Sequence, residues 1–296
     1  MSDRAPTIAE LRSRVQKDRH REIGNWLARK VARPTAVYGC WLAIRAGLSA
    51  HQVTVAALSC WLLAAAAIGT GNRLVFVIGV MLAQLGYWLD HVDGQVARWR
   101  GTSSLDGVYL DYFMHHCTNL AIGFGLGFGL AIRLADVRWV IAGFAIGMGW
   151  TGLSLHNDCR YKAFFQRLKS AKGSYRVDGG AGGRPQSPSP WPRRGRAALT
   201  WPAFKACEIH VITMALAGLG VLAIGTPTAW LFLWQALVIC MAVLAPLLAI
   251  GRATRSVSGH AAETEFARWF QSCEDFEGAG PGLGERVPLD TGVAAD

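Results

Sequence analysis

The chain has 296 residues, of which 52% are hydrophobic and 17% are charged, and its formal net charge is +10. Soluble domains average about 25% charged residues. The 40 residues from 211 to 250 contain no Asp, Glu, Lys, Arg or His, so the composition excludes an ordinary soluble protein. The seven cysteines include no CxxC pair, which supports neither a disulfide framework nor a zinc site.

The N-terminal segment is predicted to form an amphipathic helix over residues 8–33. Its apolar residues recur at roughly helical spacing among many Arg and Lys residues, a pattern typical of a helix lying on a membrane surface. A solvated basic helix is the alternative. The next apolar piece, residues 35–43, is too short to cross a bilayer and is expected to lie in the interface.

Six membrane spans are predicted from the lengths of the charge-poor apolar stretches, at residues 52–71, 74–98, 104–132, 138–157, 207–225 and 228–251. Short connections imply antiparallel neighbours. The predicted fold is therefore an all-α integral membrane bundle of six transmembrane helices, preceded by the amphipathic helix. The expected regions are an N-terminal interfacial region (1–48), a membrane domain (49–251) with a cytoplasmic loop (158–203), and a partly disordered cytoplasmic tail (252–296).

The distribution of Lys and Arg predicts the orientation. With the N-terminus in the cytoplasm, 27 of the 30 Lys and Arg residues fall on the cytoplasmic side. Both termini then face the cytoplasm, and we expect the inner cell membrane as the location. The positive charge accordingly indicates contact with anionic membrane lipids, and no nucleic-acid partner is expected. Within the loop, residues 160–169 suit a continuation of the fourth span, whereas the Gly-, Pro- and Ser-rich residues 179–196 suit a flexible segment.

Acidic residues gather where the second span ends and the third begins. Asp90 and Asp93 lie one turn apart on one helix face, and Asp111 and His115 form a matching stripe on the next helix. A carboxylate within a span costs roughly 2.5–3.5 kcal/mol, and facing carboxylates repel each other unless a cation lies between them.

Hard divalent cations take oxygen ligands and often bind phosphates at the same time. The pattern therefore predicts a Mg²⁺ or Mn²⁺ site at the cytoplasmic membrane interface, acting on a phosphate. The alternative is that these Asp residues only pair with Arg98, Arg100 and the histidines.

This segment resembles the motif of the CDP-alcohol phosphotransferases, D-x2-D-G-x2-A-R-x8-G-x3-D-x3-D. Seven of its eight fixed positions match at the correct spacing: Asp90, Asp93, Gly94, Ala97, Arg98, Gly107 and Asp111. The six-span layout with an N-terminal amphipathic helix is also similar to that family. The resemblance covers roughly residues 10–250, although the motif occupies only residues 90–115.

The resemblance implies a divalent-metal-dependent transferase. It would move a substituted phosphate, such as phosphatidyl, from a CDP-linked donor such as CDP-diacylglycerol to an acceptor alcohol, releasing CMP in phospholipid biosynthesis. Asp90, Asp93 and Asp111 would hold the metal. The donor pocket would be lined by Gly94, Ala97, Arg98 and Gly107, with Thr54 where relatives often have a Thr near the donor. Relatives are often dimers, so a homodimer is one open expectation.

Two residues near the end of the fourth span, Arg160 and Lys162, are candidates for binding an anionic acceptor or a lipid phosphate. The alternative is that they only anchor this end of the helix on the cytoplasmic side of the membrane. The sequence does not identify the acceptor alcohol or decide whether donor or acceptor carries the lipid.

The departure from the motif is His115, which stands where the family has its last Asp. A neutral imidazole can accept a proton and ligate a metal, so His115 is the predicted base and a predicted metal ligand. Alternatively, Asp106 or His116 serves as the base, or transfer activity is lost and the protein binds CDP-lipid or nucleotide through the same metal site. A transporter or channel is the third class, disfavoured because the polar residues cluster at one membrane face.

Overall fold

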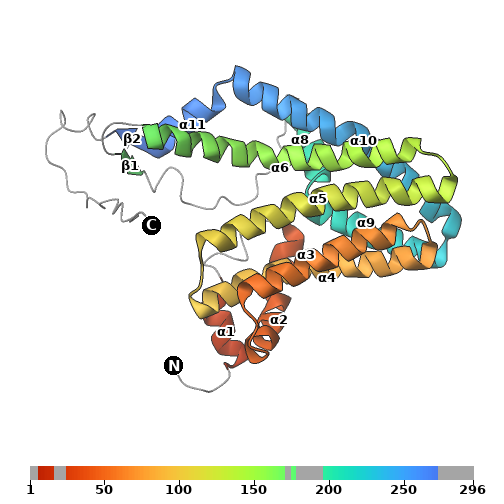
Figure 1. Cartoon of the computed structure of the whole chain (residues 1–296), viewed down its shortest axis with the longest axis horizontal. Coiled ribbons are helices and arrows are strands. Elements are labelled where there is room, and N and C mark those ends of the chain that lie inside the picture. The colour runs from red at the N-terminus through yellow and green to blue at the C-terminus, as the bar shows by residue number, and fades with distance from the viewer. Residues whose placement is uncertain (1–5, 17–24, 171–174, 178–195, 273–296) are drawn as a thin grey trace, which may run out of the picture.

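The computed structural model describes residues 6–16, 25–170, 175–177 and 196–272, and this part of the chain is almost entirely helical (Figure 1). In chain order its elements are α1 (Ile8–Val15), the π-helical turn η1 (Ala28–Ala32), α2 (Arg33–Arg45), α3 (Ala50–Gly69), α4 (Arg73–Arg100), α5 (Leu105–Leu134), α6 (Arg138–Ser170), β1 (Tyr175–Val177), α8 (Arg196–Ala206), α9 (Ile209–Gly225), α10 (Pro227–Ser258), α11 (Ala261–Trp269) and β2 (Phe270–Ser272).

Four of the described helices, α3, α4, α5 and α10, are long and apolar enough to cross a membrane. A fifth span is formed if Thr200–Ala206 and Ile209–Gly225, which meet at a 64° bend, are counted as one broken helix. These helices indicate a membrane protein. The expected fourth span falls within α6, whose apolar half is diluted by Gly, Trp and Ser, and a count of six spans stays a prediction.

Helix α5 packs between α3 and α6, and glycines allow the close approach on both sides. A Cβ atom added at Gly125 would lie 2.5 Å from the carbonyl oxygen of Ala65 on α3. One added at Gly123 would lie 2.5 Å from the backbone nitrogen of Gly147 on α6. Because no side chain separates the backbones here, the position of α5 is fixed against both neighbours.

A tight turn connects α4 to α5 and brings the two polar stripes together. Helix α4 ends at Gly101, whose left-handed backbone (φ +64°) glycine adopts without strain. Helix α5 begins after Ser104, whose hydroxyl accepts a hydrogen bond from the backbone N–H of Gly107 at 3.1 Å. The residues near the end of α4 and those near the start of α5 therefore lie opposite each other.

The N-terminal region lies at the same end of the molecule as this turn (Figure 1). The predicted helix over residues 8–33 is present in part, as α1 and η1, while residues 17–24 lie outside the described part of the chain. The apolar piece 35–43 lies within α2, which packs against α4.

The C-terminal part of the chain contains both predicted and unpredicted elements. Residues 160–169 do continue the fourth predicted span, because α6 runs to Ser170. The tail forms α11 and β2, and β2 pairs antiparallel with β1. Residues 178–195, most of the predicted flexible segment, and residues 273–296 lie outside the described residues.

The close contact at Gly125 makes the first prediction. Gly125→Ala places a methyl group against the Ala65 carbonyl, so we expect a loss of about 1–3 kcal/mol of stability from overpacking. The measurement is thermal unfolding of the purified protein in detergent. Gly218→Ala is the matched control, because a Cβ at Gly218 meets nothing within 4 Å. Equal unfolding temperatures for the two variants would contradict the close approach of α3 and α5.

Candidate metal centre and adjoining pocket

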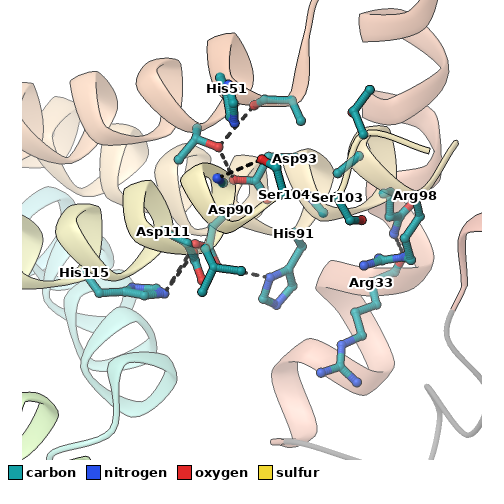
Figure 2. Close-up of a pocket in the computed structure, with 18 of the residues that line it drawn as sticks. Arg33, His51, Asp90, His91, Asp93, Arg98, Ser103, Ser104, Asp111 and His115 are labelled. Carbon is teal, nitrogen blue, oxygen red and sulfur yellow. Dashed lines mark hydrogen bonds and ion pairs between the residues drawn. The ribbon is translucent and has the colours of Figure 1, made fainter. Parts of the chain in front are cut away.

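The candidate site is formed by side chains from the end of α4 and the start of α5 (Figure 2). The His115 Nε2 atom lies 3.4 Å from Asp111 Oδ1 and 3.7 Å from Asp90 Oδ1. The ligand atoms offered by these three residues all lie within 4.8 Å of one another. One ion between them would therefore contact a ligand from each helix.

The chemistry of these donors fits a divalent cation. Asp90 Oδ1 is buried and has no hydrogen-bond partner among the described residues, although a buried carboxylate oxygen normally has one. It faces the carboxylate of Asp111 and the imidazole of His115. Two carboxylates favour Mg²⁺ or Mn²⁺, and the nitrogen ligand suits Mn²⁺ better than Mg²⁺.

A second histidine orients Asp90 from the other side. His91 Nδ1 lies 3.3 Å from Asp90 Oδ2, so the two oxygens of this carboxylate face two different imidazoles. The His91 ring also packs on the Tyr87 ring, with 4.9 Å between the ring centroids. This contact limits the movement of His91 and leaves Asp90 Oδ1 directed at the space between α4 and α5.

Asp93 lies beside the three-residue group and is held differently. Its buried carboxylate accepts a 2.7 Å hydrogen bond from the Thr54 hydroxyl of α3. It also accepts a hydrogen bond from the backbone N–H of Gly94. The structure thus brings Thr54 into the site, in contact with a motif carboxylate, and it fixes Asp93 against α3.

A pocket of about 430 Å³ adjoins these residues, a volume typical of small-molecule sites. It is formed by the first turns of α3, the last turns of α4, the following turn and the first turns of α5, with Gln16 and Arg33 from the N-terminal region. Arg33 and Arg98 lie together at one end, and Asp111 and His115 lie at the other (Figure 2). The pocket therefore offers positive charge next to a place for a cation, as an anionic phosphate ligand would require.

Most of the predicted site residues line this one pocket. It includes the predicted ligands and base together with the predicted donor-binding residues: Asp90, Asp93, Asp111, His115, Thr54, Gly94, Ala97, Arg98 and Gly107. The structure thus brings these residues together around one pocket, while the role of each residue stays a prediction.

Other candidates lie elsewhere. Arg160 forms a 2.6 Å ion pair with Glu265 of α11, and Lys162 is exposed; neither lines the pocket. His116 Nε2 lies 2.7 Å from Asp158 Oδ2 of α6, so it faces away from the pocket that His115 lines. Asp106 is exposed in the first turn of α5.

Several pocket residues were not predicted, among them Gln16, Arg33, His51, His91 and Ser104. His51 precedes Thr54 by three residues, so its place on the same helix face was a usable signal. Gln16 and Arg33 reach the pocket only through tertiary packing, for which the sequence offers no local pattern.

No protein-family model matches this chain, and no curated protein matches it. The resemblance to the CDP-alcohol phosphotransferases therefore depends on the motif residues themselves.

The three-residue group predicts metal binding that depends on both helices. Asp90→Asn and Asp111→Asn should each weaken Mn²⁺ binding by about tenfold or more, because each removes a charged oxygen ligand. Electron paramagnetic resonance of Mn²⁺ titrated into the purified protein measures this. Asp106→Asn removes the same charge outside the pocket and should leave the affinity unchanged; equal loss in all three variants would argue against a specific site.

The bond between Thr54 and Asp93 yields a separate prediction. Thr54→Val keeps the side-chain volume but removes the donor to a buried carboxylate, and we expect a loss of about 1–3 kcal/mol of stability. Thr54→Ser retains the hydroxyl and should restore most of that loss. Thermal unfolding in detergent compares the two, and a serine variant as unstable as the valine variant would refute the role of the hydrogen bond.

Proposed function

We propose that this protein is an integral membrane phosphotransferase that moves a substituted phosphate from a CDP-alcohol to an acceptor alcohol, with release of CMP. CDP-diacylglycerol is the donor we favour, which places the reaction in phospholipid biosynthesis. The observation that carries the proposal is the group of Asp90, Asp111 and His115 beside a pocket with arginines, at one end of two long apolar helices.

The proposal assigns a divalent cation to Asp90 and Asp111, with Asp93 beside them. A bound Mg²⁺ or Mn²⁺ would neutralise the charge of the donor pyrophosphate and of the leaving CMP. Asp90 Oδ1 supports this assignment, since it is buried without a hydrogen bond among the described residues and a cation would satisfy it. The positive charge of the arginines at the other end of the pocket would attract the donor, whose remaining charge is negative.

His115 is assigned as the base. Its Nε2 would accept the proton of the acceptor hydroxyl while the acceptor oxygen forms a bond to phosphorus and the bond from phosphorus to the CMP oxygen breaks. The resulting imidazolium would lie 3.4 Å from Asp111 and 3.7 Å from Asp90, whose charges stabilise it. One nitrogen lone pair cannot hold an ion and a proton together, so His115 acts as base only while Nε2 does not ligate the metal.

The membrane arrangement is part of the proposal. We assign the chain six spans with its N-terminus in the cytoplasm; the excess of Lys and Arg on one side supports this orientation, in which the pocket, both termini and the basic end of α6 would lie at the cytoplasmic face. There a water-soluble or lipid-linked acceptor can reach the pocket from the cytoplasm, while lipid chains of the donor remain between the helices.

One observation favours a second candidate function, a membrane protein that binds CDP-lipid or nucleotide without turnover. His115 lies between two carboxylates, where a protonated imidazole would itself supply the positive charge that an ion brings. Such a site would have lost the last carboxylate of the motif and with it the base.

The test is a CMP-release assay with purified protein, Mn²⁺, CDP-diacylglycerol and a panel of acceptors including inositol phosphate, glycerol phosphate, serine and choline. We expect release with one acceptor, a fall of about 10²–10⁴-fold in His115→Ala from loss of the base, and wild-type activity in Asp106→Asn.

Other outcomes separate the candidates. Metal-dependent CDP binding with no release, and activity gained by His115→Asp, would establish the second function. Neither CDP binding nor release with any CDP-alcohol would reject both.

A further inference from the structure

The N-terminal helix α1 is seated against the end of α4 that forms the pocket. Leu11 and Val15 are completely buried in an apolar cluster that includes Val92 and Val96 of α4. Beside this cluster, the Arg14 guanidinium lies 5.4 Å from the centre of the Trp99 ring of α4. Helix α1 thus packs on the motif-bearing segment through both apolar and cation–π contacts.

Arg98, a residue of the motif, adds a hydrogen bond to this contact. Arg98 Nε donates a 2.6 Å hydrogen bond to the backbone carbonyl of Val15, the last residue of α1. The final carbonyls of a helix lack partners within the helix and carry the negative end of its dipole. A guanidinium at that position satisfies such a carbonyl and also opposes its partial charge.

The glycine of the motif makes room for this arrangement. A Cβ atom added at Gly94 would lie 3.3 Å from Nη1 of Arg98, so the guanidinium lies across the face of α4 at Gly94. The residue after the docked carbonyl, Gln16, lines the pocket together with Arg98 itself. The position of α1 therefore determines the position of one wall of the pocket.

We infer that Arg98 is a positioning residue that docks α1 at the edge of the pocket, and that it affects ligand binding chiefly through this wall rather than by contacting the donor phosphates. The part about ligand binding rests on the proposed function, because the ligand it concerns is a CDP-linked donor. The docking itself stands on the contacts of Arg98, Val15 and Gly94.

The experiment measures docking and ligand binding separately in the full-length protein in lipid nanodiscs. Hydrogen exchange followed by mass spectrometry reports on residues 7–16, and titrations with Mn²⁺ alone and with CDP report on the site. We expect Arg98→Ala to speed exchange in residues 7–16 on the order of tenfold, because it removes a charge-assisted hydrogen bond. Mn²⁺ affinity should change less than twofold.

Leu11→Ala should undock α1 without altering a residue that lines the pocket, since Leu11 is buried between α1 and its neighbours. It should speed the same exchange and weaken CDP binding by about the factor seen for Arg98→Ala. The double variant should then lose no more CDP affinity than whichever single variant binds CDP more weakly. Arg100→Ala removes the same charge from an exposed position at the end of α4 and should match the wild type in every measurement.

Unchanged exchange in Arg98→Ala together with lost CDP binding would overturn the inference and make Arg98 a direct ligand. Additive losses of CDP affinity in the double variant would have the same meaning. If Arg98→Ala does not fold, Arg98→Lys decides the matter, because it keeps one donor. Intermediate exchange supports docking, and wild-type exchange with lost CDP binding refutes it. A wild-type protein that binds no CDP would defeat the proposed function, while the exchange data would still decide the docking.

Discussion

Three carboxylates in apolar helices are the constraint on which this structure depends. Each costs a few kcal/mol if it is left alone in a membrane, and the fold supplies each with partners: imidazoles for Asp90, the Thr54 hydroxyl for Asp93, and His115 for Asp111. These partners come from three helices. The helices must therefore approach closely at one end, and the remaining negative charge favours a cation between α4 and α5.

The close approach is achieved by small residues rather than by polar contacts. Gly123 and Gly125 let the backbone of α5 touch α6 and α3, so α5 cannot slide without overlapping a neighbour. At the other end, Phe76, Trp230 and Trp234 pack their rings together and fill the space between α4 and α10. A rigid apolar body thus holds a polar pocket at its edge, which suits a site where charges must keep fixed distances.

Much of the site could be predicted because its signals are local. The i, i+3 and i+4 spacing of the Asp and His residues and the short connection after Gly101 predict that the stripes on α4 and α5 lie opposite each other, and the structure does bring Asp90, Asp111 and His115 together. The partners of Arg98 and Arg160 could not be predicted. Val15 is 83 residues from Arg98, and Glu265 lies in the tail, for which the sequence predicted no particular helix. Such contacts are set by how whole helices pack, which no short pattern encodes.

The turn at residues 101–104 has a consequence for how the protein is made. Every member of the three-residue group lies between positions 90 and 115, on one helical hairpin, so the centre has very low contact order. The hairpin leaves the ribosome before α9 and α10 exist. Asp90 and Asp111 can meet their histidine partners during insertion, before the later helices assemble around them.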